Sequence, residues 1–380
     1  MIIKRKITDL LNTTLSGEKK VVILYGPRQS GKTTLIKELM GLNKISENQM
    51  FTGDDIFAQN LFGKNDLLAL QKVVGENKFL VIDEAQRIDN IGLTLKLLID
   101  NFPIMLLVSG SASFDLAEKI NEPLTGRTKT FYLYPFSYDE IADRYTRSSP
   151  EATMEDILRF GMYPKTTTLV GDSDKEDYLY EYLNNYLYKD ILTFGQIKKP
   201  AKVMDLLVLL ALQIGKEVSI AELAQNLALN QKTVGNYLDV LEKMFIIFNL
   251  RGFSRNLRKE IAKTSKYYFY DVGLRNAVIR NFNHLNLRQD TEELFENWFI
   301  SEKIKLAANT RQPANFYFWR TYDQKEIDLI EERGGSLIGY GCKFSADRSV
   351  SAPKDFVSAY DKAEFKVVNK GNFSEFLLNK

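Results

Sequence analysis

The 380-residue sequence predicts an α/β protein built on a parallel sheet core and followed by further domains. Three apolar runs of strand length, 21–25, 79–83 and 104–109, are separated by stretches with helical character such as 32–40. Residues 128–133 are aromatic and β-prone as well. Continuous apolar runs are typical of parallel strands that helices cover on both faces. A chain of this length exceeds one ordinary core and predicts two to four domains.

The composition excludes several classes of protein. Lysine and arginine total 51 and aspartate and glutamate 49, so the net charge is +2 and no overall field attracts nucleic acid or membrane. Cys342 is the only cysteine and His284 the only histidine, which argues against a disulfide framework or a metal cluster built from these residues. The longest apolar run, 206–212, is shorter than the ~20 residues of a membrane span. The charged N-terminus also lacks the apolar core of a signal peptide. We therefore expect a cytoplasmic protein without a membrane partner.

The loop at residues 26–33 has the Gly-x-x-x-x-Gly-Lys-Thr spacing of a phosphate-binding P-loop, and it lies between a predicted strand and a predicted helix. Its glycines let backbone N–H groups surround a phosphate, and the helix N-terminus adds partial positive charge. Lys32 is expected to reach the β- and γ-phosphates, and the Thr33 hydroxyl to ligate Mg²⁺. The residues expected to contact nucleotide are Gly26, Pro27, Arg28, Gln29, Ser30, Gly31, Lys32, Thr33 and Thr34.

The run at residues 79–84, Phe-Leu-Val-Ile-Asp-Glu, supports this interpretation with four apolar residues that end in two carboxylates. Asp83 at the end of the strand is expected to hold Mg²⁺ together with Thr33. Glu84 is expected to polarise a water for attack on the γ-phosphate, which favours hydrolysis over binding alone. The added glutamate is typical of ATPases with an extra strand between the P-loop and aspartate strands. No Asn-Lys-x-Asp guanine-reading motif occurs, so ATP is the predicted nucleotide.

Two further residues are candidates for the catalytic site. Ser111 follows the strand at 104–109, where a hydroxyl could orient the water or sense the γ-phosphate; an ordinary turn at the strand end is the alternative. Arg127 precedes the strand at 128–133 and could act as an arginine finger or sensor, within the chain or from a neighbouring subunit. A plain surface arginine is the alternative, and Arg28 could supply that charge instead.

Several stretches together resemble the prokaryotic AAA-type ATPases that pair an ATPase core with a C-terminal domain of unknown function. They are GPRQSGKTTL, VIDEAQRI, VSGSAS, LTGRTKTFYLYPFSYDE and GMYP, and the resemblance runs across nearly the whole chain. It implies an additional-strand (ASCE), AAA+ type core with ATPase activity, in which Lys32, Thr33, Asp83 and Glu84 carry ATP and Mg²⁺. Ser111 would occupy the sensor-like position and Arg127 the arginine-bearing position.

Residues 219–243 have the pattern of a helix-turn-helix. Ser219 and Glu222 form a predicted capping box, and Asn230 caps a second helix with apolar residues at helical spacing. Lys232 and Asn236 near the start of this second helix are candidates for contacts with duplex DNA. The alternative is a winged helix that serves only as a packing module.

The segment that would form the wing, residues 251–270, carries a net charge of +5 and includes Arg255, Arg258 and Lys266. Such local charge could neutralise several phosphates and make DNA binding salt-dependent. A solvated basic loop without a partner is the alternative.

The C-terminal segment resembles the restriction-endonuclease-like fold without its full site. Asp328 matches the first carboxylate that holds Mg²⁺, Lys343 matches the lysine that positions water, and Glu296 matches an accessory helix acid. Gly341, however, stands two residues before the lysine, where this chemistry needs a second acid. The sequence therefore favours a degenerate domain that serves interaction or stability over an active nuclease.

The expected organisation has four parts: an ATPase core at 1–140, a helical lid-like segment at 141–200, a winged-helix domain at 201–275 and the degenerate domain at 280–380. The predicted function is ATP hydrolysis as a conformational switch acting through the winged-helix and C-terminal parts. Alternatives are an ATP-gated DNA-binding regulator, a switch whose ligand is a protein partner or a second copy of the chain, and, less favoured, an ATP-dependent nuclease.

Overall fold

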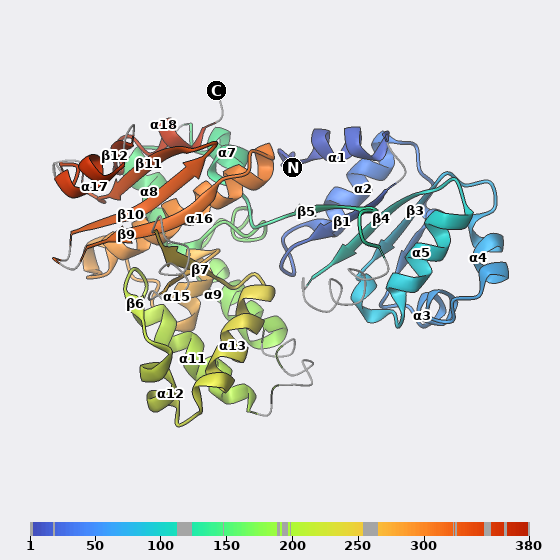
Figure 1. The fold of residues 1–380 in the computed structure, drawn as a ribbon, viewed down its shortest axis with the longest axis horizontal. Helices are drawn as coiled ribbons and strands as arrows, with labels where there is room; N and C mark the ends of the chain where they lie inside the picture. Colours follow the sequence, from blue (N-terminus) through green and yellow to red (C-terminus); the bar gives the residue numbers. More distant parts are fainter. Residues whose placement is uncertain are drawn as a thin grey trace. The chain divides into compact units, whose positions relative to one another are not determined.

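The fold is that of a computed structural model, shown in Figure 1. It describes residues 3–17, 20–111, 124–146, 148–187, 191, 197, 199–253, 265–321, 323, 325–345, 351–360 and 363–378. The chain divides into two compact units, residues 1–135 with 243–245, and residues 136–242 with 246–380.

The first unit contains a five-stranded sheet in the order β2-β3-β4-β1-β5, in which all the pairings are parallel. The strands are β1 (Val21–Tyr25), β2 (Met50–Thr52), β3 (Phe79–Asp83), β4 (Met105–Gly110) and β5 (Thr128–Tyr132). Strand β4 lies between the strand that precedes the P-loop and the strand that ends at Asp83. This is the extra strand that the added glutamate predicted, and the α/β parallel core is confirmed.

Helices cover this sheet because the strands are apolar on both faces. They are α1 (Thr8–Leu15), α2 (Lys32–Leu42), α3 (Ile56–Gly63), α4 (Leu67–Val74) and α5 (Ile91–Asn101). Leu11 of α1 and Leu35 and Leu39 of α2 are buried in one core with Val22 of β1 and Leu107 of β4. Parallel strands place their C-terminal ends at a single edge of the sheet, so Tyr25, Asp83 and Gly110 all end at the edge where α2 begins.

The second unit combines helices with a mixed sheet (Figure 1). Its helices include α7 (Tyr138–Ile141), α8 (Pro150–Phe160), α9 (Asp172–Glu181), α11 (Pro200–Leu212), α12 (Ile220–Leu227), α13 (Gln231–Lys243), α15 (Val272–Val278), α16 (Thr291–Thr310), α17 (Lys354–Ala359) and α18 (Ser374–Leu377). Its strands are β6 (Glu217–Val218), β7 (Ile247–Gly252), β8 (Ser265–Phe269), β9 (Asn315–Arg320), β10 (Glu326–Arg333), β11 (Ser336–Cys342) and β12 (Glu364–Val368).

These strands form one seven-stranded sheet in the order β12-β11-β10-β9-β7-β8-β6. Strand β8 pairs with both β6 and β7. In the sequence, β6 precedes helices α12 and α13, whereas β7 and β8 follow them. Strand β7 then pairs in parallel with β9 through Arg251 opposite Tyr317 and Gly252 opposite Phe318. The sheet is therefore continuous between the expected winged-helix and C-terminal segments, although the division into four domains and the winged-helix assignment stay predictions.

Helix α16 packs on this sheet with Leu294, Phe295, Trp298 and Phe299 buried at 1% exposure or less. Its polar residue Asn297 is buried as well, and its amide bonds both the N–H and the carbonyl of Phe269 on β8. In the part of the chain that the structure describes, no helix combines the length and apolar composition required to cross a membrane.

Candidate functional site

The P-loop turns tightly between β1 and α2. Gly31 is the residue before α2 and has φ +96°, a conformation that glycine adopts without strain. A Cβ at Gly26 would lie 2.1 Å from the carbonyl oxygen of Leu133. A side chain at this position would therefore collide with the backbone that follows strand β5. No side chain caps the N-terminus of α2. Its first N–H groups can therefore donate hydrogen bonds to an anion in the loop.

Two cations stabilise this loop from opposite sides. The Lys32 ammonium donates to the carbonyl oxygens of Gly26 at 2.8 Å and Pro27 at 3.0 Å, and so lies across the mouth of the loop. The buried Arg5 guanidinium donates to the carbonyl oxygens of Ser30 at 3.1 Å and Tyr134 at 2.6 Å. Lys32 is therefore placed where phosphate oxygens would replace the carbonyl oxygens, whereas Arg5 holds the back of the loop.

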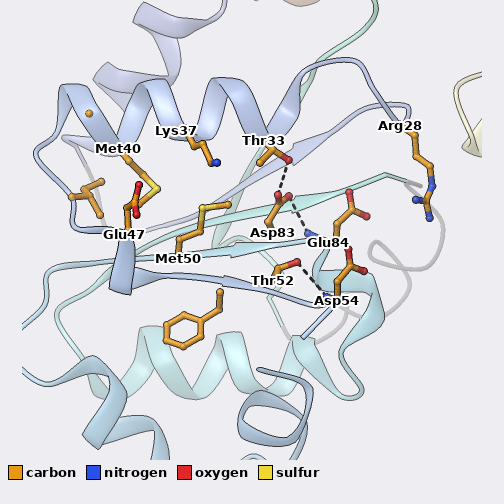
Figure 2. Close-up of a pocket in the computed structure, with 13 residues that line it drawn as sticks. Arg28, Thr33, Lys37, Met40, Glu47, Met50, Thr52, Asp54, Asp83 and Glu84 are labelled. Atoms are coloured by element: carbon orange, nitrogen blue, oxygen red, sulfur yellow. Dashed lines mark hydrogen bonds between the residues drawn. The ribbon is translucent and has the colours of Figure 1, made fainter. Parts of the chain in front are cut away.

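Thr33 and Asp83 meet at the start of α2 and the end of β3. The Thr33 hydroxyl donates to Asp83 Oδ2 at 2.8 Å, although the two residues are 50 positions apart (Figure 2). The Ser109 hydroxyl at the end of β4 donates to the other oxygen, Asp83 Oδ1. A hydroxyl and a carboxylate in contact are an oxygen donor pair of the kind that Mg²⁺ takes. The residues present therefore fit a magnesium ion.

Glu84 follows Asp83 in the left-handed conformation, with φ +50° and ψ +39°. Its carboxylate accepts a hydrogen bond from Gln86 Nε2 at 2.6 Å, and the same Gln86 amide donates to the Ser111 hydroxyl at 3.0 Å. A Cβ at Gly53 would lie 2.2 Å from the Glu84 carbonyl oxygen, so the end of β2 packs directly against this turn. Ser111 thus reaches Glu84 through Gln86.

A cavity of about 740 Å³ opens beside these groups. Figure 2 shows Thr33, Asp83 and Glu84 along it, with Met40, Met50 and Glu47 at its far end. The cavity is lined by Arg28, Thr33, Lys37, Met40, Gly41, Ile45, Glu47, Met50, Phe51, Thr52, Asp54, Asp83 and Glu84. Water and a ligand can therefore reach Glu84 from this side.

The structure does not bring every candidate to this edge of the sheet. The carbonyl of Arg127 accepts the N–H of Val21 at 2.9 Å, where β1 and β5 begin. Because the strands are parallel, this is the edge opposite the P-loop, and the Arg127 guanidinium pairs there with Asp100 of α5. Arg127 is thus absent from the site formed within the chain, and its role across a subunit interface stays a prediction.

The remaining candidates lie as follows. In the P-loop, Pro27 and Ser30 are buried, whereas Gln29 and Thr34 are exposed. In the second unit, Lys232 and Asn236 are exposed on α13. Arg255 and Arg258 lie outside the described residues. Lys266 was counted with the basic surface of the wing, and this was wrong: its side chain is 1% exposed.

Sequence reasoning missed three residues of the site. No motif marks Gln86, which follows Asp-Glu-Ala in the sequence, because its contact with Glu84 depends on the turn after β3. Ser109 could have been chosen because it ends the strand beside Asp83, but the pattern did not distinguish it from Ser111. Arg5 lies upstream of every motif, and no local signal connects it to the P-loop.

Comparison with known proteins agrees with this geometry. Family models match an AAA domain at residues 18–142, a domain of unknown function (DUF8612) at 151–285 and another (DUF4143) at 291–377. The chain therefore carries an AAA-type P-loop ATPase domain joined to a C-terminal domain of unknown function, as the motifs implied.

An uncharacterized protein of Mycobacterium tuberculosis is 30% identical over 337 residues, which cover 87% of this chain and 72% of that protein. The chain belongs to the same prokaryotic family. An uncharacterized protein of Methanocaldococcus jannaschii is 24% identical over 310 residues, covering 73% of this chain and 69% of that protein. Among solved structures, a Walker-type ATPase of Pyrococcus abyssi superposes with a TM-score of 0.49 at 14% identity, over 73% of this chain and 96% of that chain.

Proposed function

We propose that the chain binds ATP at the P-loop, hydrolyses it, and uses the nucleotide state as a conformational switch on its second unit. The observation that carries the proposal is the 2.8 Å contact between Thr33 and Asp83, with Glu84 directly after it at the same edge of the sheet. Thr33 and Asp83 would hold Mg²⁺, which neutralises charge on the phosphate oxygens when it is bound.

The chain's own residues supply the remaining chemistry. The Lys32 ammonium exchanges its two carbonyl partners for phosphate oxygens when ATP binds. The buried ammonium therefore keeps hydrogen-bond acceptors both before and after binding. Glu84 accepts a proton from the attacking water, which lies in the cavity beside it. Gln86 and Ser111 hold the Glu84 carboxylate in one orientation, which limits the positions from which water can attack.

The proposal is tested with Lys32→Ala and Glu84→Gln. Lys32→Ala should abolish ATP binding, whereas Glu84→Gln should bind ATP with an affinity close to wild type and hydrolyse it at least 100-fold more slowly, as order-of-magnitude effects of a lost general base. Lys72→Ala is the control, because Lys72 is exposed on α4 and does not line the cavity. Equal hydrolysis by wild type and Glu84→Gln would refute the role of Glu84.

A second candidate is a DNA-binding regulator whose occupancy ATP controls. The observation in its favour is that Lys232 and Asn236 are exposed one turn apart on α13, with open space around Gly235 between them. Asp239 is exposed a turn further on and would repel phosphates. Duplex DNA affinity should then fall with salt and with Lys232→Ala, and rise with Asp239→Asn. Affinity that is indifferent to all three changes would remove this candidate.

A further inference from the structure

The acidic cluster of the C-terminal part consists of Glu296 on α16 and Glu326 and Asp328 on β10. Glu296 and Asp328 are the acids that the sequence related to a metal-dependent nuclease, and the structure places a lysine against Glu296 and Glu326. Lys266 of β8 contacts Glu326 directly, and its Nζ lies 3.7 Å from Glu296 Oε1. We propose that the Lys266 ammonium is the built-in cation of this acidic cluster and excludes a divalent metal ion from it.

Burial makes this lysine different from a surface partner. The Lys266 side chain is 1% exposed, whereas those of Glu296 and Glu326 are 14% and 26% exposed. The Lys266 ammonium lies 5.3 Å from the ring centre of Phe318 on β9, so an aromatic face completes its surroundings. A buried ammonium costs several kcal/mol of desolvation unless carboxylates compensate for it. The carboxylates of the acidic cluster provide that compensation.

Other contacts hold the acids in their places around the ammonium. Tyr268, two residues after Lys266 on the same face of β8, donates its hydroxyl to Glu296 Oε1 at 2.5 Å. The N–H of Cys342 donates to Asp328 Oδ2 at 2.7 Å. Arg320 on β9 lies 3.6 Å from Glu326 and also bonds Glu217 of β6 at 3.0 Å. Each acid is therefore already engaged by groups of the chain.

The protonation of the cluster points the same way. Burial lowers the pKa of Lys266, but Glu296 and Glu326 outweigh this effect and leave its pKa above the ordinary value, so the ammonium stays charged. Among the described residues, no group of three or more acids, histidines or cysteines is arranged to hold a metal ion.

The place of the missing second acid is also filled. A Cβ at Gly341 would lie 2.9 Å from the outer end of the Phe365 ring on the neighbouring strand β12. A carboxylate side chain at this position would require that ring to move. The cluster thus lacks one ligand and carries a lysine, and both features are built from residues that the sheet holds in place.

The ion pairs of Lys266 and Arg320 also connect two segments of the second unit. Lys266 and Arg320 connect β6 and β8, from the predicted winged-helix segment, with β9, β10 and α16 of the C-terminal segment. Breaking a buried pair by removing one partner is costly, because the other charge remains in the interior. The lysine therefore joins the two segments into one body in addition to the short β7–β9 pairing, and it does so without a metal ion.

The test compares full-length wild type with Lys266→Met, which keeps the length of the side chain and removes its charge. Lys305→Met is the matched control, since Lys305 is 2% exposed and pairs with the buried Glu302 at 2.8 Å in the same unit. Urea unfolding and binding of Mn²⁺ alone are measured without nucleotide. Both variants should lower the folded-to-unfolded ratio by roughly 100- to 1,000-fold, as expected for a broken buried pair.

Only Lys266→Met should gain Mn²⁺ binding. With a dissociation constant of about 0.1 mM at the acidic cluster, 1 mM Mn²⁺ would raise the folded-to-unfolded ratio of this variant roughly tenfold more than that of wild type or Lys305→Met, since the Thr33–Asp83 pair is the same in all three. Mn²⁺ stabilisation of wild type equal to that of Lys266→Met would overturn the proposal, as would a folded Lys266→Met that binds no Mn²⁺.

If Lys266→Met does not fold, the double variant Lys266→Met/Glu326→Gln decides the question. It removes one charge of each sign, so it should fold although Lys266→Met alone does not. A double variant that also fails to fold would show that removing the acid does not compensate for removing the lysine, and would refute the proposal.

Discussion

Gln86 offers the sharpest test of how the hydrolytic base is positioned. Its Nε2 donates to Glu84 Oε2 at 2.6 Å and to the Ser111 hydroxyl at 3.0 Å, so one amide fixes the base and is itself fixed. Gln86→Leu keeps the approximate volume of the side chain and removes both donors. The Glu84 carboxylate then loses the hydrogen bond from Gln86 that holds its orientation. It can therefore rotate away from the attacking water.

The expected size of the effect follows from the type of hydrogen bond. A bond to a charged group contributes about 1.5–3 kcal/mol, which corresponds to about 10- to 150-fold in rate. Glu84 lies beside an open cavity and is partly solvated, so the lower end of this range applies, about tenfold in kcat. The Ser111 bond is between neutral groups and acts on Glu84 only through Gln86, so Ser111→Ala should cost about threefold or less.

The assay is steady-state phosphate release, with kcat and KM for ATP determined separately. Gln86→Leu should lower kcat and leave KM nearly unchanged, because the bonds it removes go to Glu84 and Ser111 and position the base. Gln49→Leu is the control: Gln49 bonds another amide, that of Asn77, and precedes β2 at the opposite edge of the sheet. A Gln86→Leu variant within twofold of wild type, or a larger loss in Ser111→Ala than in Gln86→Leu, would refute the positioning role.

Three further predictions concern Mg²⁺, the loop and pH. Asp83→Asn should raise the Mg²⁺ concentration for half-maximal ATP hydrolysis by about tenfold or more, measured by Mg²⁺ titration. Gly26→Ala should weaken ATP binding, measured by calorimetry, because its Cβ would lie 2.1 Å from the Leu133 carbonyl oxygen, whereas Gly235→Ala on α13 has open space and should not. The pKa of Glu296, about 8 when folded and roughly 4.3 when unfolded, makes the folded state hold the extra proton. The contribution of Glu296 to the unfolding free energy is thus fully present below pH ~4 and is lost as pH rises through 8; Glu296→Gln should make the unfolding free energy fall less between these pH values in urea unfolding, and an unchanged slope would contradict it.

The ATPase core was largely predictable because its signals are local. Buried parallel strands are continuous apolar runs, and the predicted strands at 21–25 and 79–83 coincide with β1 and β3. The P-loop and the Asp83-Glu84 pair were assigned correctly to the ends of those strands. Strand β2 was missed, since its three half-buried residues, Met50–Thr52, carry no periodicity, and their extended conformation depends on pairing with β3.

The second unit was less predictable because its decisive contacts are between distant segments. The Ser219 cap and the two following helices were visible in the sequence, and the Ser219 hydroxyl does accept the N–H of Glu222 at 3.3 Å. The β7–β9 pairing joins Arg251 to Tyr317, 66 positions further along the chain, and has no local signature. Lys266 illustrates the same limit, because a lysine in a basic stretch predicts a solvated charge until three acids from α16 and β10 surround it.

In the proposed switch, the path from the nucleotide to the second unit begins at the P-loop itself. Gly26 lies against the Leu133 carbonyl, and the Leu133 N–H donates to the carbonyl of Tyr25 at 2.7 Å. Leu133 is followed by Tyr134 and Pro135, the last residues of the first unit, and Arg5 bonds the carbonyls of both Ser30 and Tyr134. The loop that surrounds the phosphates and the segment that leaves the unit therefore share one buried guanidinium and one van der Waals contact. Because a Cβ at Gly26 would lie 2.1 Å from the Leu133 carbonyl oxygen, the loop has no room to shift toward β5 unless Leu133 moves with it, and in the proposed switch such a displacement would reach the covalent link to residue 136.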